Sequence, residues 1–104
     1  MRLEHGSLED LRRRLLGIIR SSPELQDARV FFFGSRVTGG GNERSDVDVG
    51  ILAKGPIPAR VWLALQEALE DLPTLYSVDL VDFHRVPAAF REIALRTAEE
   101  ISHP

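Results

Sequence analysis

Two aspartates, Asp46 and Asp48, interrupt an apolar run that otherwise has the composition of a buried β-strand. Because side chains alternate between the two faces of a strand, both carboxylates fall on one face and Val47, Val49 and Ile51 on the other. Charged groups on a strand face are costly to bury unless a partner compensates them. The segment therefore predicts a sheet with one face packed on a core and a carboxylate pair on the opposite face.

A glycine-serine pair, Gly34 and Ser35, lies ten residues before these aspartates. It ends residues 28–33, a short, mostly apolar and β-prone segment that predicts a buried strand. Glycine lets the backbone approach a phosphate group closely, and the serine hydroxyl and N–H can bind phosphate oxygens. Taken alone, the pair fits an ordinary strand-ending turn equally well. The sequence contains neither G-x-x-x-x-G-K-[ST] nor G-x-G-x-x-G, so this is not a P-loop or a Rossmann fingerprint.

The rest of the chain alternates helical and strand-like patterns, and its 104 residues, 1–104, fit a single domain. Helical or helix-turn patterns cover 8–21, 36–40, 58–71 and 87–101, and strand patterns cover 28–33, 45–53 and 76–83. A capping box at Ser7 is expected to begin the first helix. The order predicts an α+β fold, a small mixed β-sheet of about three strands or slightly more packed with about four helices.

Three of the predicted helices carry residues whose surroundings the sequence predicts. In the last helix, an apolar stripe is expected to face the core, and its members are Phe90, Ile93, Ala94, Thr97 and Ile101. In the first helix, four arginines are expected to form a solvated face, with a functional basic patch as the alternative: Arg12, Arg13, Arg14 and Arg20. Trp62, at helical spacing with leucines, is expected in the core rather than against a nucleobase.

The carboxylates have the donor chemistry of a divalent-metal site. Residues two apart on a strand lie about 6.5 Å apart at Cα, so Asp46 and Asp48 can converge on cations about 3.5–4 Å apart. Oxygen ligands favour Mg²⁺ or Mn²⁺ over zinc. Asp79, between two apolar residues of the third strand, is a third candidate ligand or base, and its burial would need a reason. Asp82 is predicted to lie on the opposite face of the strand from Asp79 and is left out of the site. For Asp46, Asp48 and Asp79, the alternative is an exposed or turn-capping role.

Arg36, directly after the glycine-serine pair, can neutralise triphosphate oxygens or remain a solvated loop cation.

Charge and composition exclude several classes of protein. The net charge of −3 disfavours a general nucleic-acid binder, which would carry a basic stripe. The polar N-terminus is not a signal peptide, and no apolar run reaches the roughly 20 residues that span a bilayer. Cysteine is absent, which is compatible with a cytoplasmic location.

The motif spacing resembles the minimal nucleotidyltransferase (MNT) branch of the DNA polymerase beta nucleotidyltransferase superfamily. That family's pattern is G-S-R, a glycine soon after, S-D-x-D, and one more acidic residue on a later strand. The resemblance covers about residues 28–83. The matching residues are Gly34, Ser35, Arg36, Val37, Gly39, Ser45, Asp46, Asp48 and Asp79.

This resemblance implies a nucleotidyltransferase fold and a Mg²⁺-dependent transfer of AMP from ATP to a hydroxyl. Asp46, Asp48 and Asp79 would be the catalytic residues and would hold two Mg²⁺ ions, or Mn²⁺, and Asp79 would also help to deprotonate the acceptor. The implied nucleotide-binding residues are Gly34, Ser35, Arg36 and Ser45. MNT proteins are similar to the antitoxin half of toxin–antitoxin pairs, so the implied partner is a HEPN-domain ribonuclease with an acceptor tyrosine. The alternatives are a binding-only antitoxin and a transferase acting on a small molecule or RNA.

Overall fold

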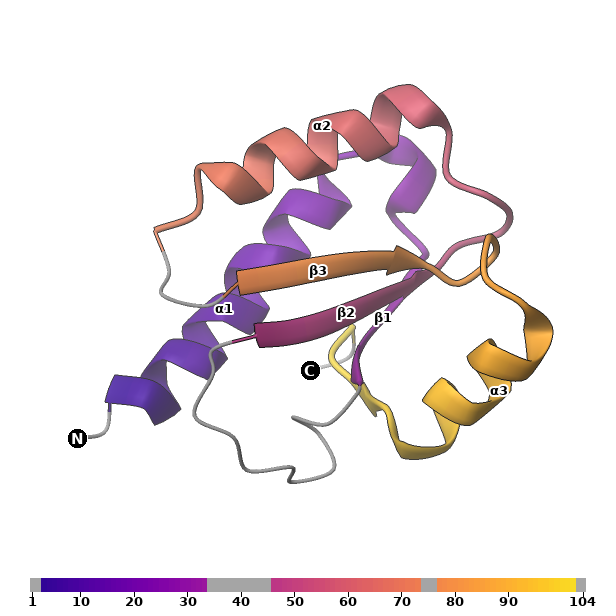
Figure 1. Cartoon of the computed structure of the whole chain (residues 1–104). Coiled ribbons are helices and arrows are strands. Elements are labelled where there is room, and N and C mark those ends of the chain that lie inside the picture. Colours follow the sequence, from indigo (N-terminus) through magenta and orange to yellow (C-terminus); the bar gives the residue numbers. More distant parts are fainter. Residues whose placement is uncertain (1–2, 34–45, 74–76, 103–104) are drawn as a thin grey trace.

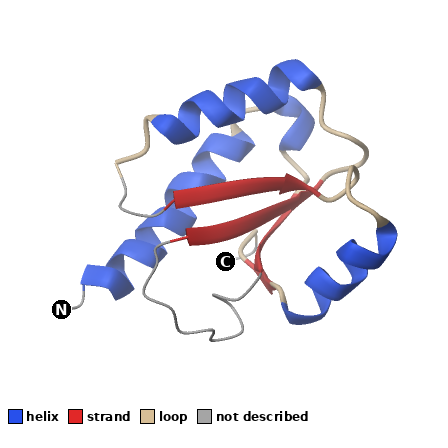
Figure 2. Ribbon diagram, viewed as in Figure 1, coloured by secondary structure: helices blue, strands red, loops and turns tan. Residues whose placement is uncertain are grey.

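The computed structural model describes residues 3–33, 46–73 and 77–102, which form one mixed sheet with helices on both faces (Figures 1 and 2). The strands are β1 (Arg29–Phe33), β2 (Asp46–Leu52), β3 (Ser77–Asp82) and β4 (Glu99–Glu100), in the order β3-β2-β1-β4. β1 is antiparallel to β2 and to β4, whereas β2 is parallel to β3. The mixed sheet predicted from the sequence is thus confirmed, with β4 as an additional short strand.

The helices of the described residues divide between the two sides of this sheet. α1 (Leu3–Arg20) and α2 (Ala59–Glu70) lie on one side, and α3 (Ala88–Thr97) lies on the other (Figure 1). A short 3-10 helix, η1 (Pro23–Leu25), leads into β1. α1 begins before the predicted position, so Ser7 lies inside the helix and not at its N-terminus. The predicted element at 36–40 lies outside the described residues, and none of the described helices could cross a membrane.

The face of the sheet that α1 and α2 cover forms the larger core. The alternation predicted for β2 is confirmed, because Val47, Val49 and Ile51 are all buried on this side. Trp62 of α2 is partly buried against the same core, as its helical spacing predicted. The other buried members include Leu11, Leu15 and Ile19 of α1, Val30 and Phe32 of β1, and Val61 and Leu65 of α2.

The opposite face carries a smaller aromatic cluster built around Phe83. Its ring is fully buried, with centroids 6.0 Å from Phe31 and 5.4 Å from Phe33. Gly50 makes room for it, since a Cβ at this position would lie 2.6 Å and 2.8 Å from the Cε2 and Cε1 atoms of Phe83. Glycine inside a strand is typical of such a close approach. Ala94 of α3 completes the buried cluster.

The apolar stripe predicted for the last helix is confirmed at Ala94, which is buried, but it is wrong for the rest of its length. α3 ends at Thr97, and the chain then extends into β4, where the Ile101 N–H donates a 2.8 Å hydrogen bond to the Val30 carbonyl. Ile101 is therefore buried as part of the sheet edge and not as part of the helix. Phe90 and Ile93, both predicted to face the core, are 39% and 64% exposed. The helix ends before the stripe is complete because the next residues, Glu99 and Glu100, pair with β1.

Candidate functional site

Asp48 and Asp79 are direct neighbours across the sheet. The parallel register of β2 and β3 pairs Asp48 with Asp79, and the antiparallel register of β1 and β2 pairs Asp48 with Phe33. Adjacent strands are about 4.8 Å apart, and residues paired in a ladder share a face. Asp48 is half-buried and Asp79 is exposed. Two carboxylates from separate segments therefore lie side by side on the face that carries α3.

The burial expected for Asp79 is wrong, and the buried carboxylate of β3 is Asp82 instead. Asp82 is 5% exposed and accepts hydrogen bonds from the backbone N–H groups of Ile57 (2.9 Å) and His84 (3.0 Å). It also pairs with Arg85 at 3.3 Å. These contacts hold the segment after β2 against the end of β3. Asp82 thus faces away from Asp79, as predicted, and has a structural role.

The remaining candidate residues are not all covered by the described part of the chain. Gly34, Ser35, Arg36 and Ser45 lie outside the described residues, and so does the side chain of Asp46. The Asp46 backbone begins β2 opposite Ser77. In the sequence, Gly34 directly follows Phe33, the residue that the register of β1 and β2 pairs with Asp48.

The Asp48–Asp79 pair fits a hard divalent cation. Like charges directly opposite each other in a sheet are destabilising, and a cation bound between them would remove that cost. Carboxylate oxygens are the ligands that Mg²⁺ prefers. Among the described side chains no three His, Cys, Asp or Glu groups cluster for a metal. The metal site predicted from the sequence therefore stays a prediction, with Asp48 and Asp79 as two neighbouring oxygen donors.

The packing that supports these carboxylates was not predicted from the sequence. Phe33 borders Asp48 in the ladder, and its ring packs on Phe83, which in turn lies over Gly50. Because Gly50 is two residues from Asp48, it shares the face of the carboxylates. A glycine in the middle of a strand was the available signal, since it marks a bulge or a close approach of another group.

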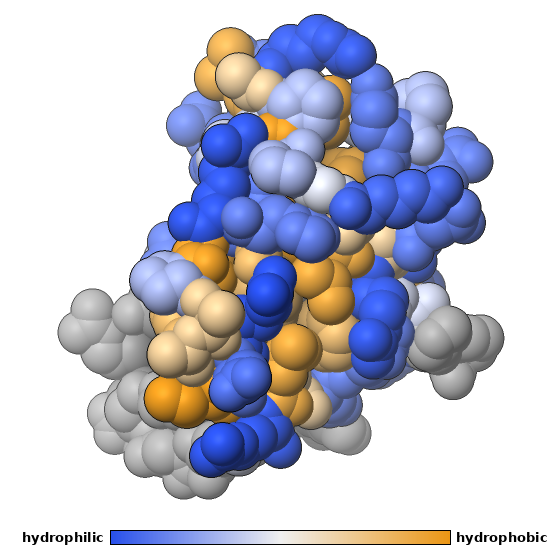
Figure 3. Space-filling model, turned by 90° about the vertical axis from the view of Figure 1, so that its right-hand side faces the viewer, coloured by the Kyte–Doolittle hydropathy of each residue, from blue (hydrophilic) through white to orange (hydrophobic). Residues whose placement is uncertain are grey.

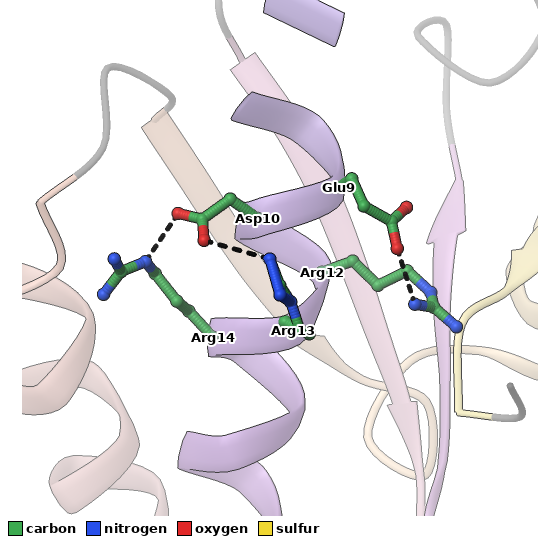
Figure 4. Close-up of polar contacts among 5 residues, drawn as sticks. All are labelled: Glu9, Asp10, Arg12, Arg13 and Arg14. Carbon is green, nitrogen blue, oxygen red and sulfur yellow. Dashed lines mark hydrogen bonds and ion pairs between the residues drawn. The ribbon is translucent and has the colours of Figure 1, made fainter. Parts of the chain in front are cut away.

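The basic face of α1 is largely neutralised by acidic residues of the same helix. Figure 4 shows Asp10 between Arg14 (2.6 Å) and Arg13 (3.5 Å), and Glu9 next to Arg12 (3.1 Å). This supports the solvated face predicted for Arg13 and Arg14, whereas the Arg12 side chain is only 24% exposed.

Arg20 at the end of α1 does not belong to this face, and the prediction was wrong for it. Its part-buried guanidinium donates hydrogen bonds of 2.8 Å to the carbonyls of Leu25 and Ala28. Arg20 thereby links the end of α1 to η1 and the start of β1.

We expect neutral substitutions on this face to have little effect. In an Arg13→Gln/Arg14→Gln variant, the free energy of unfolding should change by less than about 0.5 kcal/mol per ion pair, because exposed ion pairs contribute little. The affinity for ATP should be unchanged. Urea denaturation and calorimetric titration measure the two quantities. A loss of ATP affinity in this variant would favour the functional basic patch instead.

A cavity of about 350 Å³ lies at the other end of the sheet from the carboxylate pair. It is lined by residues of 23–28 and 53–58, which precede β1 and follow β2. Asp27 lies in its wall, is exposed, and is separated from Asp48 by the length of β1. Asp27 is therefore a suitable position for control substitutions.

A mixed sheet that sets two carboxylates side by side, in a chain whose sequence has a glycine-serine pair directly after β1, is typical of nucleotide-transferring domains. Residues 18–103 match the family described as Polymerase beta, Nucleotidyltransferase. The chain belongs to this family of nucleotidyltransferases, in agreement with the resemblance found in its motifs.

Known relatives agree with this assignment. A Haemophilus influenzae (strain Rd) protein described as a probable protein adenylyltransferase MntA is 31% identical over 86 residues, which cover 81% of this chain and 75% of that protein. A crystal structure of a toxin–antitoxin with AMP-PNP is similar, with a TM-score of 0.65 and 23% identity over 86% of this chain and 71% of that one. An MNT antitoxin in complex with a tri-AMPylated Shewanella oneidensis HEPN toxin gives a TM-score of 0.60 and 21% identity over 86% and 67%. At these identities the solved structures establish the fold.

Proposed function

We propose that this chain transfers AMP from ATP to a tyrosine hydroxyl group of a HEPN-type toxin and thereby acts as its antitoxin. The observation that carries the proposal is the ladder pairing of Asp48 with Asp79, in a chain that has Gly34 and Ser35 directly after β1 in its sequence. The similarity to a probable protein adenylyltransferase supports the same activity. The proposed setting is a single domain over 1–104 in the cytoplasm.

The proposed reaction divides its tasks among residues of the sheet and of the segment after β1. Gly34 and Ser35 hold the β- and γ-phosphates, and Arg36 and Ser45 complete the nucleotide site. Asp46, Asp48 and Asp79 would hold Mg²⁺, which would supply positive charge to neutralise the phosphate oxygens.

Asp79 has a second proposed task, as the group that receives the proton of the acceptor hydroxyl. The acceptor oxygen forms a bond to the α-phosphorus, the bond from that phosphorus to the bridging oxygen breaks, and pyrophosphate leaves. The exposure of Asp79 supports this role, since an incoming hydroxyl has to reach its carboxylate.

The test is the intact mass of the HEPN-type protein encoded by the neighbouring gene after incubation with this chain, ATP and Mg²⁺. We expect an increase by one or more AMP groups. Asp48→Asn should abolish the increase and Asp27→Asn, the same chemical change at the other end of β1, should not. A tight complex without any mass increase would instead indicate an antitoxin that masks its partner by contact.

A further inference from the structure

α3 presents apolar side chains to solvent where a core-facing stripe was expected. Among the described residues, the exposed large hydrophobic side chains are Phe90 (39%), Ile93 (64%) and Leu63 (59%). Phe90 and Ile93 are three residues apart on α3 and so share one side of the helix. We call this pair the α3 patch. Figure 3 shows apolar surface interrupted by polar groups on the side of the molecule to which α3 belongs.

The α3 patch is continuous with the carboxylate site. The Phe90 ring packs edge-on against Phe33, with a centroid separation of 6.1 Å. Phe33 is the ladder partner of Asp48, and antiparallel partners lie about 5 Å apart at Cα. A single buried ring therefore separates the patch from the strand position that carries the carboxylate. Leu63, in contrast, lies on α2, on the opposite side of the sheet.

The polar groups around the patch fit the rim of a protein interface. Glu92 and Arg96 are exposed, and neither makes an ion pair with another described residue. Arg91 donates a 3.1 Å hydrogen bond to the Phe83 carbonyl, which fixes the helix on the aromatic cluster. Protein interfaces typically combine an apolar centre with a polar rim, and their central aromatic and aliphatic anchors carry most of the binding energy.

The position of the patch indicates what covers it. AMP transfer requires the acceptor hydroxyl to come within bonding distance of a phosphate held at Asp48 and Asp79. A protein that delivers this hydroxyl must also cover the surface beside these residues, and α3 forms that surface on the Phe33 side. We propose that the α3 patch is the docking surface for the acceptor protein, which presents apolar side chains next to its acceptor hydroxyl. This inference rests on the proposed function.

The test compares Ile93→Asp with Leu63→Asp, two changes at similarly exposed positions on opposite sides of the sheet. The affinity for the purified HEPN-type partner is measured by calorimetry without nucleotide, and the affinity for ATP is measured separately. We expect Ile93→Asp to weaken partner binding by about 30-fold or more, as for an interface hot spot. Leu63→Asp should change it by less than about twofold, as for a residue outside the interface. ATP affinity should be unchanged in both variants.

Several outcomes would overturn the inference. Equal losses of partner affinity in the two variants, or no loss of partner affinity in Ile93→Asp, would place the interface elsewhere. A weakened affinity for ATP in Ile93→Asp would assign the patch to the nucleotide. A shift from dimer to monomer on size exclusion, with partner binding intact, would assign it to a second copy of this chain. Binding that depends on Ile93 without AMP transfer by the wild-type chain would support the docking surface and contradict only the proposed catalysis.

Discussion

An Asp79→Asn variant is expected to transfer AMP at a rate about 10³-fold lower than wild type, or lower still, because metal-assisted charge stabilisation contributes several kcal/mol to such reactions. Its free energy of unfolding should stay at or slightly above the wild-type value. Asp79 is exposed, and the substitution removes a like charge next to Asp48. Single-turnover transfer from labelled ATP and urea denaturation measure the two effects. The rise in melting temperature on adding Mg²⁺ and an ATP analogue should also become smaller.

Asp82→Asn is the matched control, since it makes the same change three residues away on the same strand. We expect it to lower the free energy of unfolding by about 1–3 kcal/mol, because an amide cannot accept both hydrogen bonds from Ile57 and His84 and one buried N–H loses its partner. The transfer rate of the folded fraction should remain close to wild type. If Asp82→Asn lost catalysis and Asp79→Asn did not, the assignment of the two carboxylates would be reversed.

Gly50→Ala is expected to destabilise the protein by about 3 kcal/mol, the upper part of the range for overpacking a core. The added methyl group would lie within 2.8 Å of the Phe83 ring. This ring is fully buried between Phe31 and Phe33, so it cannot turn away without displacing both. Urea denaturation should show a lower midpoint with an unchanged slope. The double variant Gly50→Ala/Phe83→Leu should lose less stability than the sum of the single changes.

Gly17→Ala makes the same chemical change as Gly50→Ala but is expected to stabilise the protein. Gly17 lies within α1, and a Cβ at this position would meet no atom within 4 Å. Alanine should therefore stabilise the protein by up to about 1 kcal/mol through its higher helix propensity. If both glycine variants were destabilised equally, the close approach of Phe83 would not be the cause at Gly50.

The strands near the site could be predicted because their side chains alternate strictly. Val47, Val49 and Ile51 face one core, and Asp48 faces the other side, as period-two alternation requires. The burial of Asp79 could not be predicted in this way. Alternation assigns a residue to a face but does not indicate how much of that face is covered. The carboxylate that the fold buries is Asp82, and one of its partners, the Ile57 N–H, lies 25 residues earlier in the chain.

The end of the chain was mispredicted for a different reason. The helical spacing of apolar residues continues from Phe90 to Ile101, past the point where α3 ends. The helix ends there because β4 pairs with β1, a strand about 70 residues earlier in the chain. Arg29 and Glu100 join the same two strands, and hydrogen bonding to Glu100 raises the pKa of the Arg29 guanidinium. The roles of Gly34, Ser35, Arg36 and Ser45 remain predictions from the sequence.

The parallel pairing of β2 with β3 has a consequence for how the site responds to its ligands. β3 is the outermost strand of the described sheet, and it meets β2 only after the chain has crossed over through α2. Edge strands are among the segments that open by local unfolding at a low free-energy cost. A ligand that bridges Asp48 and Asp79 binds only when β3 is paired with β2. The free energy of ligand binding therefore also stabilises β3 against local unfolding. Substrate occupancy and resistance of this edge to amide exchange or proteolysis are therefore thermodynamically linked.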